Sequence, residues 1–153
     1  MKIFSRVRNI IGRRRVEARP CRIVIDTNIM VGAIMKPTGA SNKILHMWIQ
    51  GRLTLLVTER ILDEYRTILS QKWLKPDRVS ELNRQLGEFA EVVDPKERVY
   101  EIKDDPSDNR FLECAAEGEA DYVISSDQHL LALKQFRRTE IVRPTQFLKR
   151  VGA

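Results

Sequence analysis

The chain has 153 residues, of which 42% are hydrophobic and 31% are charged, so it is long enough and apolar enough to form one domain with its own core. The sequence has no apolar run approaching the length of a bilayer span. Its two cysteines and two histidines argue against a disulfide framework and a structural zinc cluster. We therefore expect a single-domain protein without a transmembrane segment, located in the reducing cytoplasm.

The net charge of +6 is concentrated at the N-terminus. Residues 1–22 contain eight basic residues and one acidic residue, whereas the remaining chain is nearly neutral. Hydrophobic residues recur at helix-like spacing from Ile3 to Ile11. This pattern fits a basic amphipathic helix on RNA, an acidic partner or a membrane surface, an organellar transit peptide, or a partly disordered extension. We favour an extension over residues 1–20, with RNA attraction by Arg13, Arg14 and Arg15 as a secondary hypothesis.

From Cys21 onward, strand and helix patterns alternate along the chain. Strands are predicted at 21–25, 53–57, 121–125 and 140–143, with weaker extended segments at 91–94 and 98–102. Helices are predicted at 27–34, 41–50, 59–71, 76–90, 109–117, 127–133 and 144–151. Thr58 is suited to cap the third helix, and Gly118 is suited to end the fifth. The alternation predicts an α/β domain over residues 21–150, with a mainly parallel sheet between layers of helices.

Three acids fall where this sheet would present its carboxyl-terminal edge. Asp26 directly follows the first strand, Asp127 follows the strand at 121–125, and Asp108 lies in the turn that opens the fifth helix. In open parallel sheets, ligands bind beyond the carboxyl ends of the strands. Each of these acids also has a simpler explanation, because Asp is favoured at helix N-caps and in turns.

A fourth acid comes from the helix at 59–71. At about 100° per residue, the apolar face of this helix centres near Tyr65. Glu64 then lies roughly 100° from that centre, on the flank of the face, whereas Asp63 lies about 160° away and points to solvent. The geometry therefore selects Glu64, although a solvated helix position is its simpler explanation.

Four converging carboxylates would repel one another and raise one another's pKa values. A divalent cation removes this conflict, and an oxygen-rich ligand set favours Mg²⁺ or Mn²⁺. Such a cation binds phosphate oxygens and activates water. The pattern therefore points to phosphodiester hydrolysis.

The same residues carry a resemblance to a known family. The segments "RIVIDTNIMVGAIM", "ERILDEYRTIL", "DPSDNRFLECAAEGEADYVISSDQHLLAL" and "IVRPTQFL" occur in the order typical of PIN-domain proteins. Within that family, the chain most resembles VapC-like ribonucleases, the toxins of bacterial toxin–antitoxin pairs. The resemblance covers roughly residues 21 to 150 and implies a PIN-like three-layer fold and Mg²⁺- or Mn²⁺-dependent ribonuclease activity.

The resemblance assigns roles to individual residues. It places the four family acids on Asp26, Glu64, Asp108 and Asp127, with Asp26, Asp108 and Asp127 as metal ligands. It also matches Asn28 to the polar residue that braces the first acid, and Ser125 to a hydroxyl position usually held by threonine. The chain departs from the family where Ser126 replaces a glycine and His129 replaces a frequently acidic residue.

Several functions remain open at this point. The first is an endoribonuclease toxin that cleaves single-stranded RNA and is silenced by a small antitoxin protein, and a homodimer is a further expectation. A housekeeping RNA-processing nuclease would use the same site. A non-catalytic RNA-binding PIN module is the alternative from another class. A phosphatase with an aspartate nucleophile ranks last, because Asn28 stands where a second aspartate is expected.

Overall fold

The computed structural model describes residues 6–7, 16–17 and 19–153. In this part of the chain, a six-stranded sheet has the order β5-β4-β3-β6-β8-β7. Neighbouring strands are parallel except for β7 and β8. The strands are β3 (Cys21–Ile25), β4 (Leu53–Val57), β5 (Glu91–Val92), β6 (Tyr122–Ile124), β7 (Gln135–Phe136) and β8 (Thr139–Val142). The expected α/β fold with a mainly parallel sheet is confirmed.

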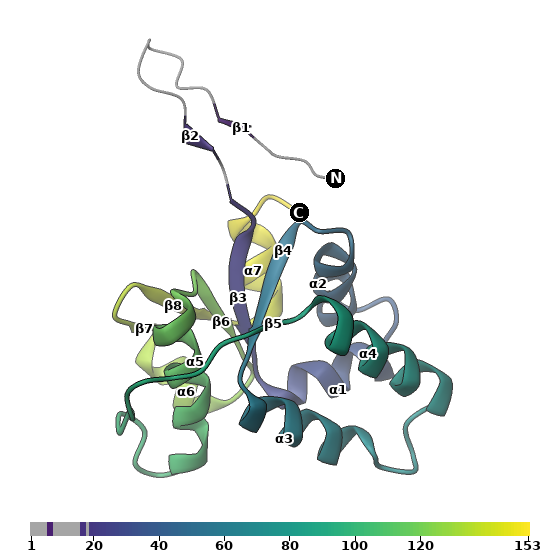
Figure 1. Ribbon diagram of the computed structural model, residues 1–153. Helices are drawn as coiled ribbons and strands as arrows, with labels where there is room; N and C mark the ends of the chain where they lie inside the picture. The colour runs from purple at the N-terminus through teal and green to yellow at the C-terminus, as the bar shows by residue number, and fades with distance from the viewer. Residues whose placement is uncertain (1–5, 8–15, 18) are drawn as a thin grey trace.

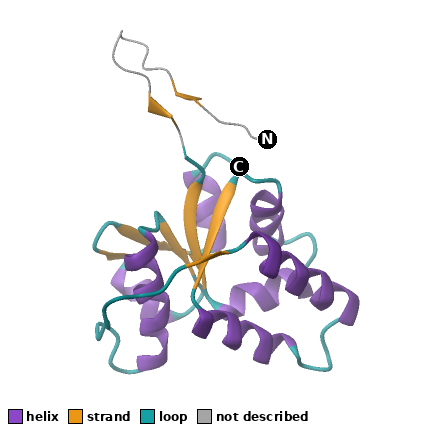
Figure 2. Cartoon of the chain, in the orientation of Figure 1, coloured by secondary structure: helices purple, strands orange, loops and turns teal. Residues whose placement is uncertain are grey.

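Helices cover both faces of the sheet (Figures 1 and 2). The helices are α1 (Thr27–Met35), α2 (Ala40–Ile49), α3 (Glu59–Leu69), α4 (Pro76–Phe89), the 3₁₀ turn η1 (Pro106–Asp108), α5 (Asn109–Gly118), α6 (Gln128–Leu133) and α7 (Pro144–Arg150). Helix α5 packs on β3, β4 and β6 from one side, and α2 and α7 pack on β4 and β6 from the other. Among the described residues, no helix is both long and apolar enough to cross a membrane.

The central strand β3 is covered on both faces. Ile23, Val24 and Ile25 have no exposed surface, which explains why this strand is a continuous β-branched run without alternating polar residues. Each such side chain contributes about 1.5–3 kcal/mol of transfer free energy when fully buried. The strand is therefore a rigid base for the residue that follows it.

Side-chain caps start the helices that leave the sheet. The Thr58 hydroxyl accepts a hydrogen bond from the Ile61 amide at 3.1 Å, which confirms the predicted cap of α3. Asp26 accepts from the Ile29 amide at 3.2 Å and caps α1 in the same way. Each cap satisfies a backbone donor at the helix start that has no partner within the helix.

Helix α5 ends at Gly118 as expected, but the glycine is its last helical residue and does not adopt the left-handed conformation. The left-handed residue that follows the helix is Glu119, with φ of +53°. The glycine serves packing, because a Cβ at position 118 would lie 2.7 Å from Cδ1 of Leu56 on β4. A glycine near a helix end therefore marks close contact with the sheet here.

The weak extended segment at 98–102 is not a strand. The Val99 amide donates to the Glu113 carboxylate at 3.0 Å, and the Ile102 amide donates to Oδ1 of Asn109 at 2.9 Å. The Asn109 side-chain amide in turn donates to the Ile102 carbonyl at 2.8 Å. Side chains of α5 therefore take the place of a neighbouring strand.

Two further features differ from the sequence pattern. Strand β7, which lies at the edge of the sheet and pairs antiparallel with β8, is an element that the sequence does not predict. In the N-terminal extension, β1 (Arg6–Val7) and β2 (Val16–Glu17) pair antiparallel, so these four residues are not helical. Arg13, Arg14 and Arg15 lie outside the described residues.

Candidate metal-dependent active site

The candidate site lies where the strand order changes direction across the sheet, between the parallel strands β3 and β6. From β3 the chain proceeds to β4 on one side, and β6 later pairs on the other side, so the carboxyl ends of β3 and β6 form a topological switch point. Ile25 pairs with Ile124 at this edge, and the Asp26 amide donates to the Ile124 carbonyl at 3.1 Å. This register brings Asp26 beside the segment that carries Ser125 and Asp127.

Asp26 is buried and held by several donors. Its carboxylate accepts hydrogen bonds from the Ser125 hydroxyl, the Ser126 amide at 3.3 Å and the Ile29 amide at 3.2 Å. Burial raises the pKa of Asp26, and these three hydrogen bonds oppose the rise. The nearby charge of Asp127 raises the pKa of Asp26 further. The structure thus holds Asp26 in one orientation at the end of β3.

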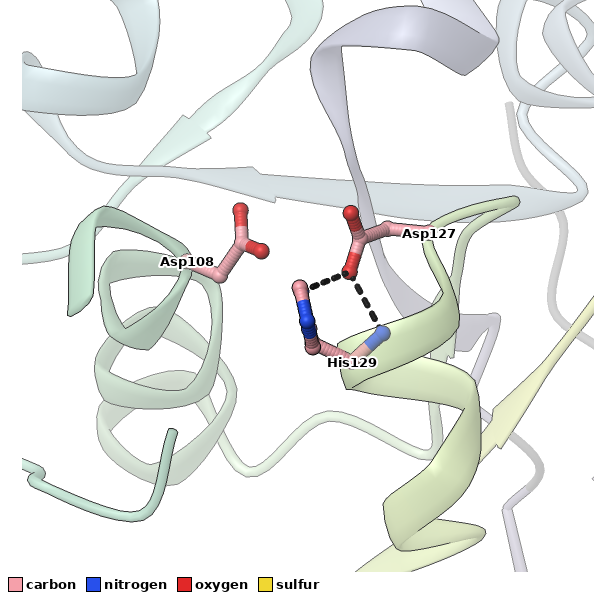
Figure 3. A group of neighbouring side chains, drawn as sticks. All are labelled: Asp108, Asp127 and His129. Atoms are coloured by element: carbon pink, nitrogen blue, oxygen red, sulfur yellow. Dashed lines mark hydrogen bonds and ion pairs between the residues drawn. The ribbon is translucent and has the colours of Figure 1, made fainter. Parts of the chain in front are cut away.

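Asp108 and Asp127 face each other from separate elements, with the His129 ring beside them (Figure 3). One ligand atom from each of these three residues lies within 4.8 Å of the others. Asp127 caps α6 by accepting from the His129 and Leu130 amides at 2.8 and 3.2 Å. The expectation that Asp127 is an N-cap is therefore correct, and it does not compete with the role in the site.

Asp108 is the acid whose protonation is most strongly altered. Partial burial, followed by the charge of Asp127, raises the pKa of Asp108 to about 7, and Asp105 and Asp26 add smaller contributions. Its Oδ2 atom is buried and has no hydrogen-bond partner among the described residues. Burial of a carboxylate oxygen without a partner costs free energy, so this atom is suited to bind a cation or a hydrogen-bond donor.

Glu64 does not belong to the group of Asp108, Asp127 and His129, so the four acids do not all converge. The helical phase that distinguished Glu64 from Asp63 is confirmed. The Glu64 side chain is 27% exposed, whereas the Asp63 side chain is 77% exposed. The buried Tyr65 hydroxyl donates to the Ile25 carbonyl and so fixes α3 against the end of β3. The Glu64 carboxylate accepts from the Thr27 hydroxyl and forms an ion pair with Arg110. Glu64 therefore has partners of its own.

The two residues expected to support the site are placed differently. Ser125 is fully buried, and its hydroxyl contacts both Asp26 and the Asp127 amide, the latter at 2.8 Å. Asn28 is exposed on the first turn of α1, and its side chain makes no hydrogen bond within the described part of the chain. Thr27, its neighbour, is buried and makes the contact with Glu64.

Sequence reasoning missed three participants. Arg110 neutralises Glu64, Thr27 orients it, and His129 joins the two aspartates. For Arg110, a signal was available, because it lies two residues after Asp108 on the same helix turn. For Thr27 and His129, position within the motifs was visible, but the side-chain direction was not.

The residues fit a divalent cation. The charge of Asp127 raises the pKa of both Asp26 and Asp108, and the orphaned Oδ2 atom of Asp108 provides a free ligand oxygen. Carboxylate oxygens are the ligands preferred by Mg²⁺ and Mn²⁺, and an imidazole is a softer addition. The three carboxylates thus suit a divalent cation and would repel an anion.

Comparison with known proteins finds relatives by sequence and by fold. An uncharacterized protein of Methanocaldococcus jannaschii, MJ1680, is 26% identical over 125 residues, covering 78% of this chain and 79% of the relative. The crystal structure of VapBC2 from Rickettsia felis, bound to a DNA fragment from its promoter, contains a chain with the same fold. Its TM-score is 0.55 at 18% identity, over 78% of this chain and 96% of that chain. VapC20 of Mycobacterium tuberculosis gives a TM-score of 0.48 at 15% identity, over 77% of this chain and 98% of that chain.

The decisive match is to a family model described as "PIN domain". It aligns with residues 22–129, which include the end of β3, the α3 acid, η1 and the first turn of α6. The match therefore spans most of the chain and all of the candidate site. The chain belongs to the PIN domain family.

Proposed function

We propose that the protein is a Mg²⁺- or Mn²⁺-dependent endoribonuclease that hydrolyses phosphodiester bonds in single-stranded RNA. Its family is one of nucleases, and its fold is shared with a chain of VapBC2. The observation that carries the proposal is the group of three acids at the switch point, in which Asp108 has a buried oxygen without a partner. Electrostatic repulsion makes such a group of carboxylates unfavourable without a cation, and a bound divalent cation would relieve that repulsion.

Each acid has a distinct part in this proposal. Asp108 and Asp127, with Asp26 beside them, would hold the cation. When bound, it would supply Lewis-acid stabilisation of phosphoryl charge and acidify a water. The Ser125 hydroxyl keeps the Asp26 carboxylate oriented, so that no rearrangement is needed when substrate arrives. Glu64, fixed by Thr27 and Arg110, would orient a water or accept its proton from the flank of the site.

We further propose that the nuclease is the toxin of a toxin–antitoxin pair and that a small antitoxin protein silences it. The support is the likeness in fold to a chain of the VapBC2 complex. A cytoplasmic location is part of the same proposal, and the free thiols of Cys21 and Cys114 are consistent with a reducing compartment. Expression of the wild-type chain should arrest growth of a bacterial host, and Asp26→Asn should relieve the arrest.

Incubation with a mixed RNA pool tests the nuclease proposal directly. The full chain should cleave RNA with Mn²⁺ or Mg²⁺ and should stop when EDTA is added. Products should carry 5′-phosphate and 3′-hydroxyl ends. Asp26→Asn and Asp108→Asn should abolish cleavage, whereas Asp77→Asn, at an exposed residue in the first turn of α4, should not. Cleavage that survives EDTA or Asp26→Asn would overturn the site assignment. Binding of RNA without cleavage under all conditions would favour a non-catalytic RNA-binding module.

A further inference from the structure

Arg110 is held in place by two contacts that do not use all of its donors. Its Nε donates to the Ser107 carbonyl at 2.9 Å, and its Nη1 pairs with Glu64. A guanidinium carries five N–H groups, so its other donors have no acceptor within the described residues. The side chain is 19% exposed, which places these donors at a surface beside the candidate site.

Arg110 and Arg60 are shared by two adjoining depressions. One depression is lined by Glu64, Thr67 and Ile68 together with both arginines. The other continues from Arg60 and Arg110 along residues 92–98, between the start of α3 and the segment after β5. We call this continuous surface the α3–α5 groove. It begins at Glu64, on the flank of the acidic site, and continues to Arg98 in the segment after β5.

Guanidinium groups with free donors lie at the end of the groove next to the site, and most of the acids that line the groove are already paired. In the first depression, Asp63 lies 3.7 Å from Arg66 and Glu64 pairs with Arg110. The second depression also has four acids, of which Asp94 pairs with Lys96, Glu97 pairs with Arg137 and Glu113 accepts from the Val99 amide, while Glu59 has no ionic partner among the described residues. Arg60 is exposed and forms no ion pair with any described residue. At the far end, Arg98 is also exposed and likewise unpaired within the described part of the chain. Guanidinium groups with free donors match phosphate oxygens in shape and charge.

We propose that Arg60 and Arg110 bind backbone phosphates of a single-stranded RNA that follows the α3–α5 groove away from the acidic site. The choice of RNA as occupant rests on the proposed nuclease function, because the groove opens at the candidate site. Phosphate contacts of this kind position a strand without reading its sequence. Arg110 then has two roles, since it also fixes Glu64.

The test measures binding of a fluorescein-labelled 12-nucleotide single-stranded RNA to the full chain in EDTA, where cleavage does not interfere. Arg60→Gln should weaken binding about tenfold, the loss expected for one charged hydrogen bond. It should also make the salt dependence shallower by roughly 0.7 in log–log slope. Arg52→Gln removes the same charge from an exposed residue that directly precedes β4, outside the groove, and it should change neither quantity. Equal effects of Arg60→Gln and Arg52→Gln would overturn the proposal.

Arg110 needs a further comparison, because its removal also leaves Glu64 unpaired. The double variant Arg110→Gln/Glu64→Gln removes both partners, and a melting curve checks that it remains folded. If Arg110 contacts phosphate, the double variant should still bind the RNA about tenfold more weakly than Glu64→Gln alone. Wild-type binding by the double variant would limit Arg110 to holding Glu64 and overturn its part in the proposal.

A protein partner with an acidic segment is the competing occupant. Polyglutamate of matched charge should therefore compete poorly for the groove, because carboxylates spaced along a peptide lack the geometry of a nucleic-acid backbone. Competition as effective as that of unlabelled RNA, abolished in Arg60→Gln, would assign the groove to an acidic protein segment instead. These binding experiments are independent of cleavage, so failure of the groove and failure of the nuclease proposal are distinguishable.

Discussion

The Ser125 hydroxyl donates a hydrogen bond to the Asp26 carboxylate, and these two residues lie 99 positions apart in the sequence. The same hydroxyl oxygen accepts the Asp127 amide at 2.8 Å. One small, fully buried side chain therefore connects the first acid of the site to the backbone of another. The connection depends on the parallel pairing of β3 and β6.

Ser125→Ala should slow RNA cleavage and raise the pH needed for it. Loss of the hydroxyl removes a hydrogen bond that favours charged Asp26, so the pKa of Asp26 should rise further. It should also reduce the free energy of unfolding by about 1–3 kcal/mol, since a buried acceptor and an amide lose a partner. Urea melts and a pH–rate profile measure both effects. Ser126→Ala is the matched control, because this exposed residue contacts Asp26 through its amide alone. An unchanged acidic limb in Ser125→Ala would contradict the prediction.

The metal-free protein should lose stability as the pH rises toward 7 and beyond, through Asp108. Its folded pKa of about 7 lies above the usual carboxyl range, so the folded state binds the proton more tightly. The stabilising contribution is complete below pH of about 4 and is lost as the pH rises through about 7.

Asp108→Asn removes this dependence. In EDTA, it should raise the melting temperature by about 2–4 °C at pH 8 and by less at pH 5. Asp94→Asn should have no such effect, since its side chain is 91% exposed. A gain from Asp108→Asn that is equal at both pH values would show that ionisation of the buried Asp108 carboxyl beside Asp127 is not its cause.

Glu64→Gln should reduce cleavage by about 10²-fold or more, the range for loss of a positioned acid or base, while Asp63→Asn should have little effect. The reason is their different placement on α3, where Glu64 contacts Thr27 and Arg110 and Asp63 faces solvent. Single-turnover rates at saturating protein separate the chemical step from RNA binding. A larger effect at Asp63 would refute the assigned role of Glu64.

Mn²⁺ should stabilise the protein more than Mg²⁺ at equal concentration, because the His129 imidazole lies among the ligand oxygens and nitrogen ligands favour transition metals over Mg²⁺. His129→Gln should reduce the Mn²⁺-induced rise in melting temperature more than the rise with Mg²⁺. The exposed His46 on α2 offers the control His46→Gln. Identical reductions for both ions would exclude His129 as a ligand.

Deletion of residues 1–18 should leave a folded, metal-dependent nuclease that binds RNA more weakly and with a shallower salt slope. The deletion removes six basic residues and one acidic residue. Each RNA phosphate that the truncated protein no longer binds should reduce the slope by roughly 0.7. Arg19 is retained, because its guanidinium makes two hydrogen bonds to Asp121, each of 3.1 Å. If binding and its salt slope are unchanged in the truncated protein, the extension does not engage phosphate.

The order of elements could be predicted because local signals coincide with the fold. The apolar run from Cys21 to Ile25 and the Thr58 cap identify their elements without knowledge of neighbours. Parallel pairing then requires Asp26 and Asp127 to lie at the same edge of the sheet, so most of the acidic group could be predicted from the sequence as well. The periodicity of α3 distinguished Glu64 from Asp63 for the same reason.

Contacts between distant side chains could not be predicted in this way. The pairing of Arg110 with Glu64 joins two helices, and His129 reaches the aspartates only because α6 starts beside η1. Residues 98–102 have a strand-like composition, but Asn109 satisfies the Ile102 amide and carbonyl from a helix that lies alongside them. Whether side chains satisfy these backbone groups in place of a neighbouring strand depends on where α5 lies in the fold.

Helix α5 also connects the packing of the sheet to the geometry of the site. Its first turn carries Arg110, two residues after Asp108, and its last residue, Gly118, lies against Leu56 with no room for a Cβ. A helix of ten residues is about 15 Å long and bends little. Any side chain at position 118 would push this end off the sheet and tilt the other end, so the spacing of the acids is set in part by a residue that never touches them.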